Sequence, residues 1–121
     1  MNRLAVGATT CSVEAMSQIT AWLADGGLLA YPTDTFYGLG ADPRSPRAVD
    51  AIFDVKGRDE HQAIPLIAAS HAAVRSLAGS SWSPRLDRFL ADFWPGPLSL
   101  VVGAADLPVE VHRGRGTVAV R

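Results

Sequence analysis

The chain has 121 residues, of which 48% are hydrophobic and 19% are charged. These values predict one globular domain that can bury a core, and they leave too little chain for two such domains. The 11 basic and 12 acidic residues give a net charge of -1. This balance argues against a protein that binds nucleic acid through bulk electrostatics, so any binding of anions must rely on a local group of cations.

The basic residues and the single thiol narrow the class of protein further. Ten of the 11 basic residues are arginine, and Lys56 is the only lysine. Cys11 is the only cysteine, which excludes a disulfide framework and a cysteine-based structural zinc site. No apolar run approaches the roughly 18 residues that a membrane span requires, and no secretory signal is evident. We therefore expect a soluble protein of the cytoplasm with no membrane partner.

The N-terminal part predicts a helix, a strand and a loop. The helix begins after the N-cap Ser12 and ends at Gly26, and its apolar side chains recur at helical spacing: Val13, Met16, Ile19 and Leu23. We expect this stripe to pack on a sheet. Residues 28–31 form a short apolar strand, and residues 32–40 are too rich in hydroxyls and glycine for a core element, which indicates a loop.

The middle of the chain continues with two helices around a strand. Ser45 and the proline after it open a helix that stops at Lys56, with three apolar residues directed inward: Val49, Ile52 and Phe53. Residues 64–68 are a candidate buried strand. Residues 70–78 form a short helix with Val74 and Leu77 inside.

The last third predicts a helix, a corner and two strands. Ser83 caps a helix whose apolar residues we expect to be buried: Leu86, Phe89, Leu90 and Phe93. Residues 94–97 form a rigid corner, in which Trp94 and the prolines are structural rather than ligand-binding. Strands follow at 98–102 and 117–120. Because strands alternate with helices, the fold class is α/β.

Several kinds of catalytic site are excluded by the absence of their motifs. The chain has no phosphate-binding P-loop, dinucleotide-binding glycine motif, nucleophile elbow or zinc-protease motif. His61, His71 and His112 share no ligand spacing, so we expect no metal site. Nothing near Cys11 would activate a thiolate for covalent catalysis.

The loop at 32–40 is the first candidate binding segment. Thr33 and Thr35 offer hydroxyls that donate and accept hydrogen bonds, and Gly38 and Gly40 allow a ligand to approach the backbone closely. An ordinary turn with surface threonines explains the same residues equally well.

Two groups of cations are the next candidates. Lys56 and Arg58 flank a glycine and together suit phosphate or carboxylate oxygens. The alternative is a basic helix end that merely stabilises the helix dipole. A second group lies at residues 113–116 and is followed by Thr117 and Arg121; taken alone, this segment is typical of a solvated turn.

Five short segments, in order over almost the whole chain, carry the most distinctive residue combinations. They are YPTDTFYGLG at 31–40, AIF at 51–53 with KGR at 56–58, IPLI at 64–67, FWPGPLS at 93–99 and TVAVR at 117–121. In their order and spacing these segments resemble the YrdC/TsaC family of threonylcarbamoyl-AMP synthases.

The resemblance implies a YrdC/RibB-like twisted mixed sheet flanked by helices, with a concave, positively charged cavity. It also implies a nucleotidyltransferase that makes threonylcarbamoyl-adenylate and pyrophosphate from L-threonine, bicarbonate and ATP, with Mg²⁺ accompanying the ATP. This product serves the threonylcarbamoyladenosine modification of tRNA. The implied partners are therefore the downstream tRNA threonylcarbamoyl transferase proteins, with weak binding of tRNA itself as a further expectation.

The resemblance assigns roles residue by residue. Thr35 and Arg121 fall at positions that bind the threonine substrate, with Thr33 beside them. Five residues fall at positions that face the nucleotide: Lys56, Arg58, Gln62, Ser99 and Thr117. Lys56 and Arg58 are also the expected catalytic residues, because every reacting species except the threonine amine is negatively charged. No protein-bound metal is implied.

The length of the chain also departs from the family. Family members continue beyond the TVAVR strand into further helices and strands with a Ser-Ala-Asn motif that completes the ATP site. We therefore expect residues 1–121 to be one YrdC-like domain with its C-terminal part missing, and we expect low or no synthase activity from these residues alone.

Two other functions remain open at this point. A non-catalytic module could use the same cations to bind tRNA or double-stranded RNA, although the net charge of -1 argues against a broad footprint. A related carbamoyl-transfer module of a hydrogenase-maturation protein has a similar pattern within a much longer chain.

Overall fold

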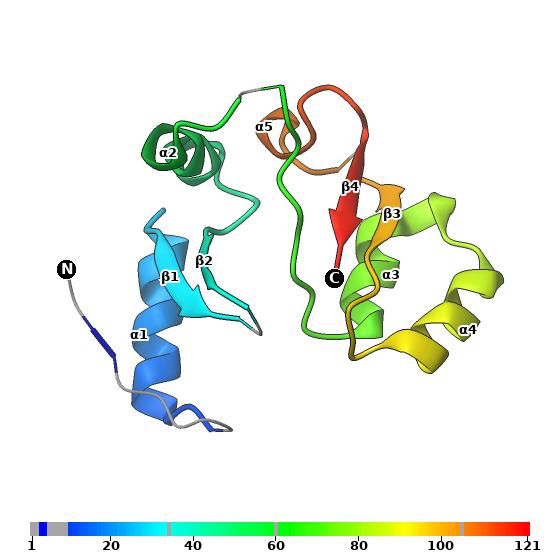
Figure 1. Ribbon diagram of the computed structural model, residues 1–121, viewed down its shortest axis with the longest axis horizontal. Coiled ribbons are helices and arrows are strands. Elements are labelled where there is room, and N and C mark those ends of the chain that lie inside the picture. Colours follow the sequence, from blue (N-terminus) through cyan, green and yellow to red (C-terminus); the bar gives the residue numbers. More distant parts are fainter. Residues whose placement is uncertain (1–2, 5–9, 34, 60, 105) are drawn as a thin grey trace. The chain divides into compact units, whose positions relative to one another are not determined.

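The two halves of the chain fold around separate pairs of strands. The computed structural model describes residues 3–4, 10–33, 35–59, 61–104 and 106–121. They divide into two units, Met1–Lys56 and Gly57–Arg121, each with its own helices and its own two-stranded antiparallel sheet (Figure 1). The predicted α/β class is confirmed.

Helix α1 (Val13–Ala24) opens the first unit as predicted. The Oγ of Ser12 accepts a hydrogen bond from the N–H of Ala15 at 3.1 Å and so caps the helix. The predicted inward stripe is wrong for two of its four residues, because Val13 is 81% and Met16 is 52% exposed. The inward side is instead the i, i+4, i+8 row of buried Ala15 and the half-buried Ile19 and Leu23. The inward face is therefore rotated relative to the predicted stripe, and the small side chain of Ala15 did not indicate this from the sequence.

A tryptophan and a glycine connect α1 to the next strand. Trp22 donates its indole N–H to the carbonyl of Leu28 at 2.8 Å, and the N–H of Gly27 donates to the carbonyl of Trp22 at 2.9 Å. A Cβ on Gly27 would lie 2.3 Å from the indole ring. Only glycine therefore allows the ring to lie against the chain here.

Strands β1 (Leu29–Pro32) and β2 (Tyr37–Gly40) form an antiparallel hairpin. The expected strand at 28–31 is confirmed with a shift of one residue, whereas the expected loop at 32–40 contains β2. Tyr31 pairs with Gly38, and a Cβ on Gly38 or Gly40 would lie 2.8 or 2.9 Å from the Tyr31 ring. Gly38 and Gly40, which suggested a loop, thus belong to a strand and leave the space that the Tyr31 ring occupies.

Helix α2 (Pro46–Lys56) ends the first unit. The Oγ of Ser45 accepts from the N–H of Ala48 at 3.4 Å, which confirms the predicted start. The three predicted inward residues are buried: Val49, Ile52 and Phe53. The helix stops where Gly57 takes a φ of +55°.

The second unit contains helices α3 (His71–Ala78) and α4 (Pro84–Phe93), with a 3₁₀ turn η1 (Gly79–Ser81) between them. Ser83 caps α4 as predicted, and Ser70, which was expected to be the first residue of its helix, is the N-cap of α3. Strand β3 (Leu100–Gly103), the short helix α5 (Val109–His112) and strand β4 (Thr117–Val120) follow. The four-residue α5 and the 3₁₀ turn were not predicted, because neither is long enough to show a hydrophobic period.

Strand β4 is the centre of the second unit. It pairs antiparallel with β3, and Leu66 forms a parallel bridge to Val120 on its other edge. Hydrogen bonds continue this pairing: the N–H of Leu66 donates to Ala119, that of Arg121 to Leu66, and that of Ala68 to Arg121, at 2.8–2.9 Å. Residues 64–68 are therefore extended, but they alternate between half-buried and exposed, so the expected burial of this strand is wrong.

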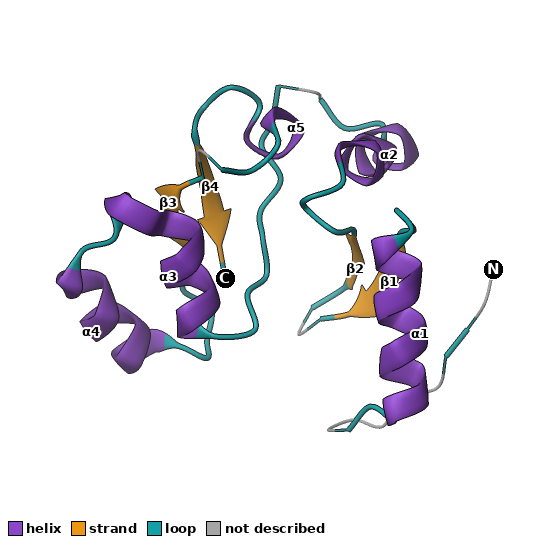
Figure 2. Cartoon of the chain, turned by 180° about the vertical axis from the view of Figure 1, so that it is seen from behind, coloured by secondary structure: helices purple, strands orange, loops and turns teal. Residues whose placement is uncertain are grey.

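Helix α3 lies along one face of the β3–β4 pair in both views of the ribbon (Figures 1 and 2). The core of this unit is the apolar set Val74, Leu90, Val102, Val118 and Val120, each 5% exposed or less. The predicted burial of Phe89 and Phe93 is wrong. They are 46% and 53% exposed and stack on each other with ring centroids 6.2 Å apart.

The predicted corner after α4 is confirmed. The Trp94–Pro95 peptide bond is cis, and the indole N–H of Trp94 donates to the carbonyl of Leu98 at 2.7 Å. The tryptophan thereby spans the turn that leads into β3, which agrees with a structural role.

The close contact between the Trp22 ring and Gly27 provides a test of the packing in the first unit. We expect Gly27→Ala to lower the free energy of unfolding by about 1–3 kcal/mol, because the new methyl group displaces the indole ring and its hydrogen bond. The measurement is urea unfolding followed by circular dichroism. In a Trp22→Ala background the same substitution should cost almost nothing; an equal cost in both backgrounds would contradict the proposed clash.

Candidate functional site

The predicted site residues divide between the two units. Thr33, Thr35 and Lys56 belong to the first unit, whereas five others belong to the second: Arg58, Gln62, Ser99, Thr117 and Arg121. The structure therefore provides two partial sites, each with its own geometry.

Thr33 closes the tip of the β1–β2 hairpin. Its hydroxyl oxygen accepts from the N–H groups of Thr35 and Phe36, both at 3.2 Å, and the hydroxyl donates to the carbonyl of Phe36. The N–H of Thr33 also donates to the Phe36 carbonyl, at 3.1 Å. The hydroxyl is thus occupied by the turn, which corresponds to the structural alternative for this residue.

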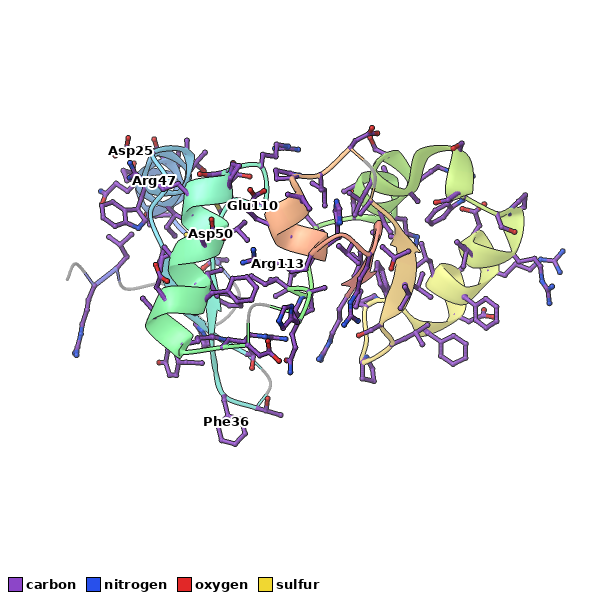
Figure 3. All side chains as sticks on the ribbon, turned by 90° about the horizontal axis from the view of Figure 1, so that it is seen from above. Asp25, Phe36, Arg47, Asp50, Glu110 and Arg113 are labelled. Carbon is purple, nitrogen blue, oxygen red and sulfur yellow. The ribbon has the colours of Figure 1, made fainter. Side chains whose placement is uncertain are left out.

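Thr35 has a different environment on the same turn. Its side chain is exposed, and the contact between its Oγ1 and that of Thr33 is long, at 3.5 Å. The neighbouring Phe36 is 84% exposed and projects from the hairpin tip (Figure 3). Among the described residues, the Thr35 hydroxyl has only this long contact, so of the two threonines it is the one that a ligand can engage more readily.

Lys56 is the last residue of α2, and its side chain is exposed. It forms no ion pair with any residue that the structure describes. Its ammonium group lies at the helix C-terminus, where a cation is electrostatically favourable even without a ligand. The position supports both the proposed binding role and the simple capping alternative.

Arg58 lies in a compact loop at the start of the second unit. Its Nη2 donates to the carbonyl of Ala63 at 3.3 Å, and its Nε is buried without a hydrogen-bond partner among the described residues. Within the loop, the N–H of Gln62 donates to the carbonyl of Asp59 at 3.1 Å, and the Gln62 side chain is exposed. Arg58 is therefore folded back against the loop that presents Gln62.

The alternation of β4 brings Thr117 and Arg121 to one surface. Val118 and Val120 are each 1% exposed, whereas Thr117 and Arg121 are exposed and Ala119 is half-buried. Successive side chains of a strand point to opposite faces, so Thr117, Ala119 and Arg121 share the face away from the core. We call this surface of the second unit the open face.

Neighbouring strands add an apolar floor to the open face. Val101 pairs with Ala119 and is 71% exposed, and Ile67, next to the bridging Leu66, is 68% exposed. Ser99 is exposed and lies opposite Arg121 when the register of Leu100 with Val120 is continued by one residue. This apolar floor was not predicted from the sequence, although the alternation of residues 117–121 was a signal for it.

The pairing also fixes which site residues lie near one another. Ser99 and Arg121 lie at one end of β4. The loop of Arg58 and Gln62 leads into the extended segment parallel to β4, so it lies at the other end, with Thr117. Thr117 and Arg121 are four positions apart along the extended chain, which corresponds to about 13 Å.

The described residues show neither a candidate metal site nor a candidate membrane span. Over the described ranges, no group of three or more His, Cys, Asp or Glu residues could hold a metal ion. Likewise, no helix in the part of the chain that the structure describes is long and apolar enough to cross a membrane.

Comparisons with known proteins agree with the motifs. The Sua5/YciO/YrdC family model, which is described as "Telomere recombination", matches residues 21–121. A threonylcarbamoyl-AMP synthase of Thiobacillus denitrificans is 41% identical over 102 residues, which are 84% of this chain and 54% of that protein. A protein of the same name from Halorhodospira halophila is 42% identical over 105 residues, covering 84% of this chain and 53% of that protein.

A solved structure matches the fold as well. The structure of Pyrococcus abyssi Sua5 complexed with L-threonine has a TM-score of 0.81 and 34% identity, and the match covers 89% of this chain and 32% of that one. The chain spans about half the length of the bacterial relatives named above.

The hairpin tip provides a test of the structural role of Thr33. We expect Thr33→Val to destabilise the hairpin by about 1–2 kcal/mol, because the turn loses the hydroxyl that accepts two N–H groups. Hydrogen exchange at the amides of Thr35 and Phe36 should be faster in this variant and near the wild-type rate in Thr33→Ser, which keeps the hydroxyl. Unchanged exchange in Thr33→Val would show that the hydroxyl does not hold the turn.

Proposed function

Because its residues 21–121 match the family model, the chain belongs to the Sua5/YciO/YrdC family, and we propose that it forms part of a threonylcarbamoyl-AMP synthase. The observation that carries this proposal is the open face of β4. It presents Ser99, Thr117 and Arg121, three residues assigned to substrates from the sequence, on one surface with an apolar floor.

The threonine end of this site would be at Arg121. A guanidinium group can bind the threonine carboxylate through two parallel hydrogen bonds. The floor of Val101, Ala119 and Ile67 would accommodate the apolar part of the substrate, since exposed apolar side chains gain by losing contact with water. For the first unit, taken by itself, the exposed Thr35 is a separate proposed contact to threonine.

The nucleotide end would be at Thr117 and the loop of Arg58 and Gln62. We propose that the Arg58 guanidinium neutralises phosphate oxygens and that Gln62 faces the nucleotide. For the first unit, taken by itself, the exposed Lys56 ammonium is a further proposed phosphate contact. Ser99, which the family resemblance also assigns to the nucleotide, lies at the opposite end of β4, next to Arg121. A relative solved with L-threonine supports binding of the amino acid by this fold.

The proposed chemistry follows from the charges of the reactants. The threonine amine attacks bicarbonate to form a carbamate with loss of water, and a carbamate oxygen then attacks the α-phosphorus of ATP. The bond from the α-phosphorus to the bridging oxygen breaks, and pyrophosphate leaves with both electrons. Fixed cations lower this barrier because negative charge spreads over the phosphoryl oxygens in the transition state. Mg²⁺ would arrive on the phosphates and balance part of that charge.

The competing proposal of an RNA-binding module has less support. The relatives that match most of this chain are named as synthases. We therefore assign tRNA and the tRNA threonylcarbamoyl transferase proteins to later steps, as users of the product, and we place the reaction in the cytoplasm.

A binding measurement tests the proposed function. Isothermal titration of the chain should detect ATP with Mg²⁺ and, separately, L-threonine. Binding of neither substrate, together with salt-dependent binding of RNA, would replace the synthase proposal with the RNA-binding one.

Substitution of Lys56 is the most direct single-residue test of nucleotide binding. We expect Lys56→Ala to weaken ATP binding by roughly tenfold or more, because a charge-assisted contact to phosphate is lost. The thermal midpoint should change little, since the side chain is exposed. Arg44→Ala, which also removes an exposed cation of the first unit, is the matched control and should bind ATP normally. Normal ATP affinity in folded Lys56→Ala would contradict the assigned role.

Arg121 provides the corresponding test for the amino acid. Arg121→Lys keeps the charge but loses the paired donors of the guanidinium, so we expect threonine affinity to fall by roughly tenfold while ATP affinity is nearly unchanged. Titration calorimetry with each substrate measures both. An equal loss for both substrates would indicate that Arg121 does not act at the carboxylate.

A further inference from the structure

The loop that carries Arg58 and Gln62 is anchored by residues 111–115, to which no function has been assigned. Inside the loop, its contacts are local: Arg58 to Ala63, Gln62 to Asp59, and the N–H of His61 to the Asp59 carboxylate at 2.9 Å. Such short-range bonds shape a loop but do not fix its place on the protein.

Two contacts join this loop to α5 and to the turn that follows it. The N–H of Ile64 donates to the carbonyl of Val111 at 3.0 Å, which ties down the end of the loop. The Nη2 of Arg115 donates to the carbonyl of His61 at 3.3 Å, which reaches the loop at its centre. The residues joined by the second bond are 54 positions apart in the sequence.

The segment that presents Arg115 has a defined shape of its own. Arg113, Gly114 and Gly116 all have positive φ values, of 49°, 78° and 66°. The N–H of Gly116 donates to Nδ1 of His112 at 3.3 Å, and that of Arg115 donates to the carbonyl of the same residue at 3.0 Å. A turn built in this way directs Arg115 toward the loop.

We propose that Arg115 is a positioning residue for nucleotide binding. It connects the loop of Arg58 and Gln62 to the turn that leads directly into Thr117, so the residues at the nucleotide end of β4 keep a fixed spacing. This inference rests on the proposed function, because it takes those three residues as the nucleotide contacts. Arg115 itself acts through the loop backbone and not on the phosphates.

The first test is structural and needs no ligand. Hydrogen exchange at the amides of His61 and Gln62 should be faster in Arg115→Ala than in the wild type, and largely restored in Arg115→Lys, which keeps a donor. Arg88→Ala removes an exposed cation of α4 and should leave these amides unchanged. Unchanged exchange in Arg115→Ala overturns the proposal.

The second test separates positioning from direct contact with the ligand. By titration calorimetry, Arg115→Ala should bind ATP roughly five- to tenfold more weakly, with unchanged affinity for L-threonine. In a Gln62→Ala background the same substitution should cost less, because both changes act on one loop. Fully additive losses would indicate a direct contact and overturn the proposal. If the wild type itself binds no ATP, the proposed function fails first, and the variants are not needed to show it.

Discussion

The alternation of side chains along β4 is the constraint on which the second unit depends. A central strand must bury one face in the core, and Val118 and Val120, each 1% exposed, do so. Because side chains alternate along a strand, Thr117, Ala119 and Arg121 then lie on the other face. A shift of one residue in the register would expose the buried valines and bury the residues of the open face. The register that packs the core therefore also determines which residues form the open face.

Much of this architecture could be predicted from the sequence, for physical reasons that differ between elements. Serine caps at Ser12, Ser45 and Ser83 located three helix starts, because a side-chain oxygen must satisfy the first free N–H groups. Strand β4 was found because its residues are β-branched and apolar. The cis bond at Trp94–Pro95 and the short α5 left no periodic signal.

The errors came from residues whose burial depends on partners distant in sequence. Phe89 and Phe93 have core-like chemistry but stack on each other at the surface, and the outward side of α1 carries Val13 and Met16. In the hairpin, Gly38 and Gly40 suggested a loop because glycine usually marks one, whereas here the ring of Tyr31 requires them. For the candidate site, the motifs gave the residues, but only the pairing around β4 showed which of them share a surface.

The central claim is that substrates bind on the open face of β4, and methyl NMR tests it most directly. Titration with L-threonine should shift the methyl resonances of Ile67, Val101 and Ala119, which lie on that face. The methyls of Val74 and Leu90, both 0% exposed in the core, should shift little. Threonine-dependent shifts confined to other surfaces, such as α1 or the Phe89–Phe93 pair, would contradict the account.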